Sequence, residues 1–521
     1  PELAKDFAEH YELAGEKTLA FDAWCESARF ERRRFDKQAA YACYQKAVTL
    51  LPDLPVEMYS GQLHGLIYDW GDYAYDLDDT STCRMLYDMA REYGEAHQDT
   101  VLIADALCGF GRLAEMQGQF DEGIDSLNRA LFFLKNSNDK QRLIETYSRL
   151  GFLFEIKHEY KRARTAFEEG LKIEKDLSDQ KMLDSAVNLE TRYSLLVCMM
   201  GFPSLAEEIA DQAVNESLLV FRQSARVQAY AALAAAQYYG GKYKKSFQNA
   251  IAVYKLACQL NLSRWKVLLD LVLAKDYLAS GLLDESWDHL QSAMEHSDIF
   301  IMKDMDLFST TILGDIYRLL GDLPAAEAQY RKGSTQRLDT LQSLENYYLL
   351  GLTLCIRGKA EEGISIIREA ALKADALGLE GVSMLAGLYA QTLSSDNLNE
   401  ESMARDILPI IKKMEERGFG SGRWNAALIQ GEFALRQGKI AVAKKTFLET
   451  LRITHDMDHH WVELWALTGL VGITKTDKVE CYHYQQRILS LLDEMSEHAL
   501  KKPLNTLFGK FRKQVVQKLL I

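Results

Sequence analysis

The sequence contains very little proline. Only 7 of its 521 residues are proline, against a typical share of about 5 %. Because proline interrupts helices, its scarcity favours long uninterrupted helices and disfavours a turn-rich β protein. Hydrophobic residues make up 48 % of the chain and charged residues 26 %, so the chain can bury a core and is not a disordered polypeptide. We therefore expect a folded, mainly helical protein.

Paired cysteines and long apolar runs are missing too. The 8 cysteines lie tens of residues apart without a C-x-x-C pair, so we predict neither a disulfide framework nor a zinc site. This cysteine usage predicts a reducing, cytoplasmic location. No apolar run approaches the roughly 18 residues that a bilayer requires, so we expect no membrane contact. The first residues lack both Met and a signal-peptide layout, which is typical of a piece of a longer protein.

Positive charge is not in surplus. Lys and Arg number 61 against 75 Asp and Glu, for a net charge of -14, the opposite of what a phosphate-tracking surface needs. We therefore expect no nucleic-acid partner. The sequence also lacks a G-x-x-x-x-G-K-[ST] phosphate loop, a G-x-S-x-G elbow and an H-E-x-x-H motif, which predicts no enzyme activity and no cofactor in this region.

The densest group of metal-ligand residue types is the segment THDMDHHW, which contains His455, His459 and His460 with two aspartates between them. Imidazoles and carboxylates at this spacing can hold a divalent ion. Loops between helices are polar in any case, and no further ligand is identifiable. We favour a solvated loop with a helix cap and predict no metal.

The glycine-rich segment GFGSGR at 418–423 contains G-x-G-x-G. It follows no strand, so a dinucleotide site is disfavoured. We predict a flexible loop between repeats.

A repeating unit of helix, tight turn and helix organises the chain. A small residue, usually glycine, marks each turn, and the marks recur about every 40 residues. Further small residues come seven positions before and five positions after each turn, and helices can approach closely only at such positions. Larger rings such as Phe167, Tyr330 and Phe447 are expected to fill the wedge to the next pair. The turn residues are Gly118, His158, Gly201, Gly241, Gly281, Gly321, Gly358 and Gly438.

This pattern resembles the tetratricopeptide repeat (TPR). The resemblance is carried by LGFLFEIKHEYKRARTAFEEGL at 150–171 and LGDIYRLLGDLPAAEAQYRKGS at 313–334. The usual period is about 34 residues, so the longer period here indicates longer helices. The resemblance implies an all-α fold, a right-handed α-solenoid or superhelix of TPR-like helix pairs.

We divide the chain into three parts. Residues 1–52 lead into the array, residues 53–499 form the repeat superhelix with a degenerate pair at 379–417, and residues 500–521 form a capping helix. The tail is basic and amphipathic, which suits a helix that shields the last repeat. Docking of this helix on upstream domains is the alternative.

The first 52 residues differ from the repeats that follow, and a further resemblance is carried by His10, Tyr11, Ala14, Gly15, Ala20, Trp24, Ala28, Ala39, Tyr44, Ala47 and Leu50. With these residues the segment resembles the start of the sensor array in the STAND class of signal transduction ATPases, which includes bacterial transcription activators and cyclase-linked relatives. This resemblance implies a bacterial sensor that follows an ATPase module in the parent chain and regulates it on binding an inducer or a protein. A free-standing TPR scaffold for protein assembly, without a coupled ATPase, is the alternative.

The first helix of each pair usually lines the concave, ligand-binding face of a solenoid. In the TPR register, Arg112, Arg149 and Arg192 fall on this face in three successive repeats, where an acidic peptide or another anionic ligand would suit them. Isolated surface arginines paired with Glu155 or Glu145 are the alternative. Charge reversal at Arg149 and Arg192 is expected to weaken ligand binding and leave stability nearly unchanged.

The second half of the concave face is less polar. Aromatic side chains there suit a protein partner or a small apolar ligand, although packing between repeats is the alternative. We therefore expect a protein or peptide partner, or a small inducer, in the concave groove. Besides the three arginines, the candidate binding residues are Phe152, Tyr238, Lys275, Phe308, Asp315 and Tyr348.

Overall fold

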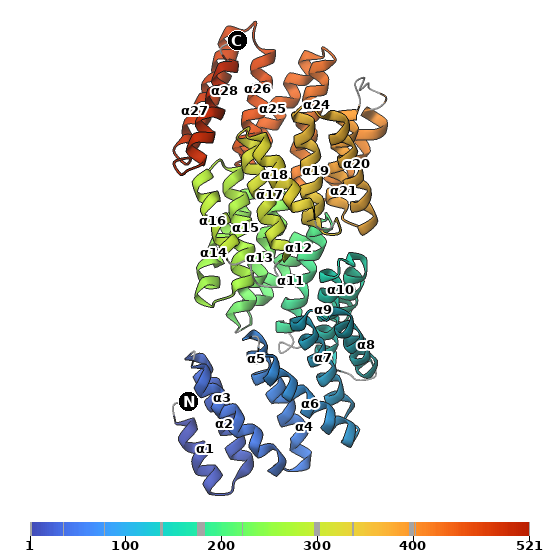
Figure 1. Ribbon diagram of the computed structural model, residues 1–521, viewed down its shortest axis with the longest axis vertical. Helices are drawn as coiled ribbons and strands as arrows, with labels where there is room; N and C mark the ends of the chain where they lie inside the picture. Colours follow the sequence, from blue (N-terminus) through green and yellow to red (C-terminus); the bar gives the residue numbers. More distant parts are fainter. Residues whose placement is uncertain are drawn as a thin grey trace. The chain divides into compact units, whose positions relative to one another are not determined.

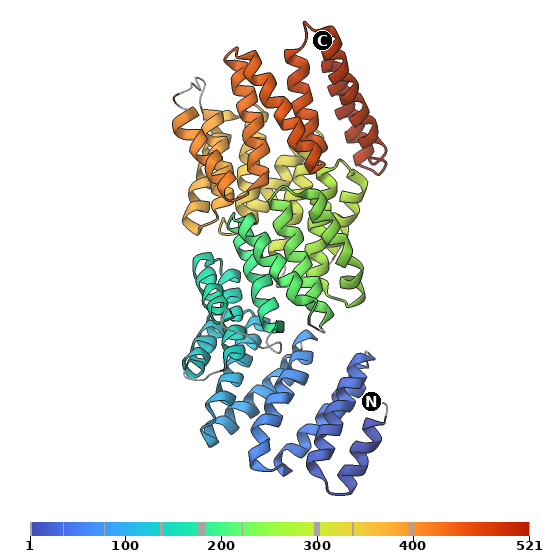
Figure 2. The same ribbon diagram turned by 180° about the vertical axis from the view of Figure 1, so that it is seen from behind.

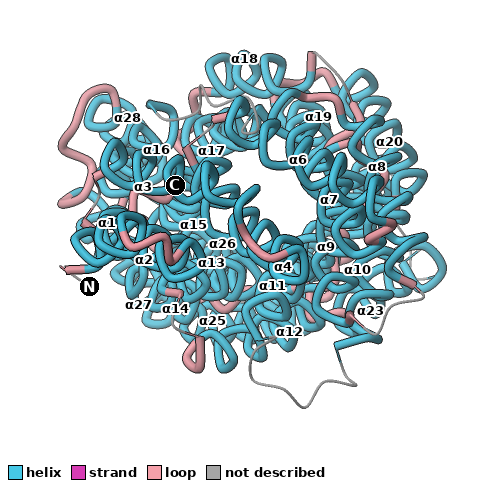
Figure 3. The backbone as a smooth tube through the Cα atoms, turned by 90° about the horizontal axis from the view of Figure 1, so that it is seen from below, coloured by secondary structure: helices cyan, strands magenta, loops and turns pink. Residues whose placement is uncertain are grey.

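The computed structural model describes residues 3–34, 36–77, 79–135, 139–174, 183–220, 222–295, 303–335, 338–394, 401 and 403–519. Within these ranges the regular structure is helical throughout, and the segments between the helices are loops and turns (Figures 1 and 3). The predicted all-α fold is confirmed. The same ranges contain no helix with both the length and the apolar character that a bilayer crossing requires.

The chain divides into two compact units, which we describe separately. Unit 1 consists of residues 1–157 and 165–177, and unit 2 of residues 158–164 and 178–521. The helices from the start of the chain through α9 lie in unit 1, and α10 contributes to both units. The helices from α11 onward lie in unit 2.

In unit 1, helices that follow one another along the chain pack against each other. Aspartates at helix starts recur in it: the side chains of Asp79, Asp99 and Asp139 accept hydrogen bonds from backbone N–H groups in the first turns of α6, α7 and α9, which satisfies amides that a helix leaves free. The helices are α1 (Ala4–Leu13), α2 (Lys17–Arg33), α3 (Lys37–Leu50), α4 (Val56–Leu66), α5 (Asp72–Asp76), α6 (Thr80–His97), α7 (Thr100–Gln117), α8 (Phe120–Leu134), α9 (Lys140–Ile156) and α10 (Tyr160–Glu174), with a short 3-10 helix η1 (Leu51–Asp53) and a short π-helix η2 (Ile67–Gly71).

Unit 2 continues the pairing of consecutive helices (Figure 2). Its first helices, α11, α13, α15, α17, α19 and α21, also contact one another in sequence and form an inner layer. The helices are α11 (Leu183–Met199), α12 (Pro203–Ser217), α13 (Gln223–Tyr239), α14 (Tyr243–Gln259), α15 (Ser263–Ala279), α16 (Leu283–Glu295), α17 (Lys303–Leu319), α18 (Leu323–Ser334), α19 (Leu341–Ile356), α20 (Ala360–Leu377), α21 (Glu380–Ser394), η5 (Met403–Ile407), α23 (Leu408–Glu416), α24 (Gly420–Arg436), α25 (Ile440–Met457), α26 (His460–Ile473), α27 (Lys478–Ser496) and α28 (Leu504–Leu519).

The predicted turn residues all adopt the left-handed backbone conformation. The seven glycines have φ between 69° and 92°, and His158 has a φ of 60°. Glycine has no Cβ to clash in this region, which explains why it marks the turns. The predicted turn positions are confirmed.

Large rings fit into sockets left by glycines within the helix pairs. A Cβ on Gly151 would lie 2.8 Å from the Phe167 ring, and a Cβ on Gly431 would lie 2.7 Å from the Phe447 ring. These rings therefore pack inside their own pair. Phe447 also reaches the following pair, where a Cβ on Gly469 would lie 2.8 Å from its ring.

The predicted flexible loop at 418–423 is wrong from Gly420 onward, because α24 begins at this residue. The glycines serve a close backbone contact instead of flexibility. A Cβ on Gly420 would lie 2.5 Å from the Cα of Gly241, so no larger residue fits at this position without a shift of the backbone.

Later helix pairs of unit 2 pack back on the turns of earlier ones. The Trp461 Nε1 donates to the Leu278 carbonyl oxygen at 2.7 Å across 183 positions, and the Ser280 hydroxyl donates to the Asp458 carbonyl oxygen at 3.2 Å across 178 positions. Unit 2 thus winds back onto itself after about 180 residues. At its end, α28 buries Leu504 and Phe508, and the Phe511 ring lies 5.5 Å from that of Trp461.

Candidate functional site

The arginines predicted on the concave face of unit 1 form ion pairs with carboxylates of the preceding inner segment. Arg112 donates to Asp72, and Arg149 Nη1 lies 3.8 Å from Glu115 Oε2. Both guanidinium groups lie over the Tyr75 ring, at 4.6 Å and 5.8 Å from its centroid. The structure thus brings Arg112 and Arg149 together, but in a setting where their charges are already matched.

Several of these pairs join residues that are one period apart. Arg29 binds Asp69 with an Nε–Oδ2 distance of 2.8 Å, and the Tyr75 hydroxyl donates to Glu115 at 2.8 Å; both pairs span 40 positions. The Arg112–Asp72 pair also spans 40 positions. The polar residues of this face therefore connect successive repeats of unit 1, which stabilises their stacking.

The space beside these pairs is small. A cavity of about 30 Å³ is lined by Tyr68, Asp105, Cys108, Arg112, Arg142 and Arg149, among others, which is room for about one water molecule. Arg192 belongs to unit 2, where its Nε donates to Asn188 Oδ1 at 3.1 Å. Phe152 is only 2 % exposed, so its ring is not available to a ligand in this structure.

A larger hollow of about 560 Å³ lies between α6, α7 and α8 of unit 1. Arg84, Arg91 and Arg129 line it together with Glu92 and Glu122. Because both basic and acidic side chains line this hollow, it has no clear preference for a ligand of one charge.

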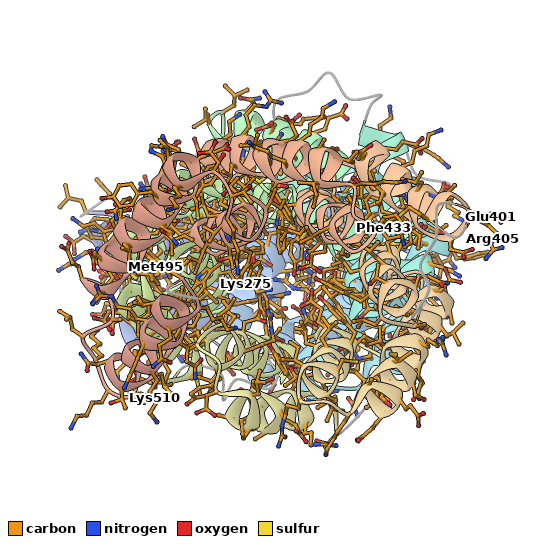
Figure 4. All side chains as sticks on the ribbon, turned by 90° about the horizontal axis from the view of Figure 1, so that it is seen from above. Lys275, Glu401, Arg405, Phe433, Met495 and Lys510 are labelled. Carbon is orange, nitrogen blue, oxygen red and sulfur yellow. The ribbon has the colours of Figure 1, made fainter. Side chains whose placement is uncertain are left out.

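The inner layer of unit 2 contains a buried cation with aromatic neighbours. Lys275 on α15 is 8 % exposed. Its ammonium nitrogen lies 4.3 Å from the centroid of the Phe308 ring, 5.4 Å from that of Tyr238 and 5.7 Å from that of Tyr239. Viewed from above, Lys275 lies on the inner side of the surrounding unit 2 helices (Figure 4). Aromatic ring faces attract a cation, which holds the ammonium in this position.

Glu345 on α19 is the acidic counterpart of Lys275, but the two do not pair. Glu345 is 8 % exposed, and its Oε2 has no hydrogen-bond partner. Burial raises the pKa of Glu345, while Lys275 acts in the opposite direction. Among the described residues, no nitrogen–oxygen approach within 4.0 Å joins Lys275 to Glu345 or to another carboxylate.

The other predicted residues of this region line the same layer. Asp315 accepts hydrogen bonds from Arg318 at 2.9 Å and from the Tyr330 hydroxyl at 2.7 Å. The Tyr348 ring is 8 % exposed and stacks on that of Tyr389 with a centroid distance of 6.4 Å. The structure therefore brings Tyr238, Lys275 and Phe308 into direct contact and places Asp315 and Tyr348 within electrostatic range of Glu345.

Sequence reasoning missed Glu345 and Tyr239. Glu345 comes six positions before Gly351, and Phe308 comes six positions before Gly314, so both occupy one register position in successive pairs. That position faces the same layer as Lys275. A charged residue at this register position is the sequence signal that points to Glu345.

The histidine-rich segment is not the solvated loop that we expected. Helix α25 runs to Met457, and the His459 ring lies 5.2 Å from that of Tyr243 and 5.3 Å from that of Trp424. This enclosure lowers the pKa of His459 to about 3. The side chains of His455 and Asp456 lie outside the described residues, and among the residues described no group of three or more potential metal ligands gathers.

Helix pairs, left-handed turn residues and an inner layer of first helices define the class of this protein: an all-α solenoid of TPR-like helix pairs. No protein-family model matches the sequence. A search of curated proteins also gives no match.

Several solved structures are similar to the chain. One is a Rap protein complexed with competence and sporulation factor, at 13 % identity over 76 % of this chain and 99 % of that chain, with a TM-score of 0.47. Another is the Cut9–Hcn1 hetero-tetramer of APC/C, at 11 % identity over 96 % and 93 %, with a TM-score of 0.49. A third is the human IFIT1 dimer with PPP-AAAA, at 15 % identity over 75 % and 90 %, with a TM-score of 0.36. All three TM-scores are below 0.5, and the fold assignment rests on the chain's own helices.

Proposed function

We propose that this chain is a helical-repeat scaffold that binds a peptide or protein on the inner layer of unit 2. The observation that carries the proposal is the burial of Lys275 and Glu345 without an ion pair to any described residue. Burying a charge without a partner costs several kcal/mol. On other inner helices the charges of Arg112, Arg149 and Arg318 are matched by carboxylates. The two unmatched groups Lys275 and Glu345 therefore support a place where a ligand supplies the partners.

Selection from a phage-displayed library of 12-residue peptides tests this function. Selected peptides are synthesised with a photoreactive benzoylphenylalanine, and the cross-linked residues are located by mass spectrometry. We expect cross-links in the inner helices α13, α15, α17 and α19. Cross-links confined to the outer helices α14, α16 and α18, or a failure to select any peptide, would contradict the proposal.

We further propose that the chain is the sensor region of a bacterial STAND-type ATPase. Only the resemblance of residues 1–52 supports this coupling. Ligand binding regulates an ATPase only when the ligand binds one of its states more tightly than the other. We place the protein in a reducing compartment such as the cytoplasm, in line with its eight free cysteines.

The gene sequence upstream of Pro1 tests the coupling to an ATPase. The proposal expects a phosphate loop in the same reading frame, and ATP hydrolysis by the longer protein that changes when a selected peptide is added. An initiating Met a few residues before Pro1 would instead favour the free-standing scaffold.

A further inference from the structure

Helices α15, α17 and α19 of the inner layer of unit 2 carry charged side chains of both signs. Lys275 and Arg318 are basic, and Asp315 and Glu345 are acidic. Of these four, Arg318 and Asp315 are bound to each other at 2.9 Å, whereas Lys275 and Glu345 make no ion pair within 4.0 Å in the described part of the chain. Each of these two side chains is 8 % exposed.

The ammonium of Lys275 and the carboxylate of Glu345 have different surroundings and do not form an ion pair. The ammonium of Lys275 is held among Phe308, Tyr238 and Tyr239 at 4.3 to 5.7 Å from the ring centroids. Glu345 comes from α19, whereas Lys275 comes from α15. Oε2 of Glu345 is buried and accepts no hydrogen bond from the residues that the structure describes, so a ligand's donor that reaches it gains a bond without displacing one that the protein makes.

We propose that Lys275 and Glu345 form a two-point subsite for a peptide segment that carries an acidic and a basic side chain close together. The ligand's carboxylate accepts from the Lys275 ammonium, and the ligand's cation donates to the Glu345 carboxylate. The rings of Tyr238, Tyr239 and Phe308 cover the aliphatic parts of the bound segment. This inference rests on the proposed function, because it names the chemistry of the ligand that the inner layer binds.

A purely acidic or purely basic segment fits this subsite less well. An acidic segment pairs with Lys275 but places a second carboxylate beside Glu345, and a basic segment creates the same conflict at Lys275. Complementary charges on both sides satisfy both groups, and like charges in a buried site strongly disfavour the wrong ligand.

Fluorescein-labelled octapeptide pools test the proposal. All pools share flanks of mixed Gly, Ala, Leu and Tyr, and they differ only at two central positions: Asp-Lys and Lys-Asp, Asp-Asp, Lys-Lys, or Asn-Gln. Binding to the full chain is measured by fluorescence anisotropy. We expect a mixed-charge pool to bind about tenfold more tightly than either like-charged pool, in line with loss of one charged partner.

The variants Lys275→Met and Glu345→Gln remove one charge each at nearly constant size. Each is expected to abolish the preference for mixed charge: Lys275→Met shifts it toward the Lys-Lys pool and Glu345→Gln toward the Asp-Asp pool. Lys412→Met and Glu416→Gln are the matched controls, because these side chains form an exposed pair on α23 at 3.8 Å. Thermal unfolding of each variant shows whether it is folded, and the near-isosteric Glu345→Gln keeps the test decisive if Lys275→Met does not fold.

The possible failures can be told apart. If the Asp-Asp pool binds as tightly as the mixed pools and Glu345→Gln changes nothing, the site reads a simple anion and the two-point proposal is wrong. If no pool binds but library-selected peptides cross-link to α15 and α19, the two-point proposal is wrong while the scaffold function stands. If neither pools nor selected peptides reach the inner layer, both proposals are wrong.

Discussion

Gly241 and Gly420 touch through their backbones, although they belong to helix pairs far apart in the sequence. A Cβ on Gly420 would lie 2.5 Å from the Cα of Gly241, and a Cβ on Gly241 would lie 3.0 Å from the Cα of Gly420. Gly201 and Gly381 repeat the arrangement, with a Cβ on the first 2.6 Å from the Cα of the second. Glycines at these positions therefore let one winding of unit 2 rest directly on the next.

The variant Gly420→Ala is expected to destabilise unit 2 by about 1–3 kcal/mol, because the added methyl group has no space and the two windings must separate. Chemical denaturation followed by tryptophan fluorescence measures this, since Trp424 lies on the same helix. Gly509→Ala is the matched control, because Gly509 has no neighbouring atom within 4 Å of its Cβ position. It is expected to leave stability unchanged or raise it by up to about 1 kcal/mol. Equal losses in the two variants would contradict the steric argument.

Charge reversal at Arg149 is expected to destabilise unit 1, in contrast to the stability-neutral effect expected from the sequence alone. The Glu115 side chain, 3.8 Å from Arg149, is only 3 % exposed. In Arg149→Glu two carboxylates would face each other in this half-buried place, at a cost of about 3 kcal/mol. Adding Glu115→Gln removes the repulsion and should recover part of the loss in urea denaturation. Absence of recovery would show that the ion pair does not determine the effect.

The features predictable from the sequence are those set by local rules. A left-handed turn favours glycine, so the turns could be placed at Gly118 and Gly201, and the repeat spacing also placed one at His158. The contact of Gly241 with Gly420 could not be placed in this way, because it depends on how small rotations between pairs add up over about 180 residues.

The candidate site shows the same division. The register placed Lys275 on the concave face and Phe308 at a neighbouring position, and in the structure the Lys275 ammonium lies 4.3 Å from the centroid of the Phe308 ring. The register did not predict that Arg112 pairs with Asp72, although the two residues are 40 positions apart and thus one period from each other. Which charges remain unpaired depends on side-chain distances, and Glu345 therefore became visible only in the structure.

Replacing the left-handed histidine of the turn series is expected to stabilise the protein. His158 has a φ of 60°, a conformation that costs a side-chain residue about 1–2 kcal/mol. His158→Gly relieves this strain but loses the 3.3 Å hydrogen bond between Tyr160 Oη and His158 Nδ1, so we expect a net gain of about 0.5–1 kcal/mol. Thermal unfolding measures the change. Gly358→Ala is the converse control: its φ is 85° and its Cβ position is open, so it should lose about 1 kcal/mol through backbone strain alone.

Acid is expected to destabilise unit 2 through His459. Its pKa is lowered from 6.5 to about 3 by burial and by the neighbouring His460. Between these two pH values the unfolded chain binds a proton that the folded chain does not, so stability falls as the pH is lowered from about 6.5, by at most about 1.4 kcal/mol per pH unit for this group. Denaturation curves of wild type and His459→Gln between pH 8 and pH 4 isolate the effect, because carboxylates titrate equally in both. We expect the wild type to lose stability relative to His459→Gln as the pH falls. The control variant His483→Gln, at an exposed position, should follow the wild type. Parallel curves for wild type and His459→Gln would show that His459 takes up its proton equally in the folded and the unfolded chain.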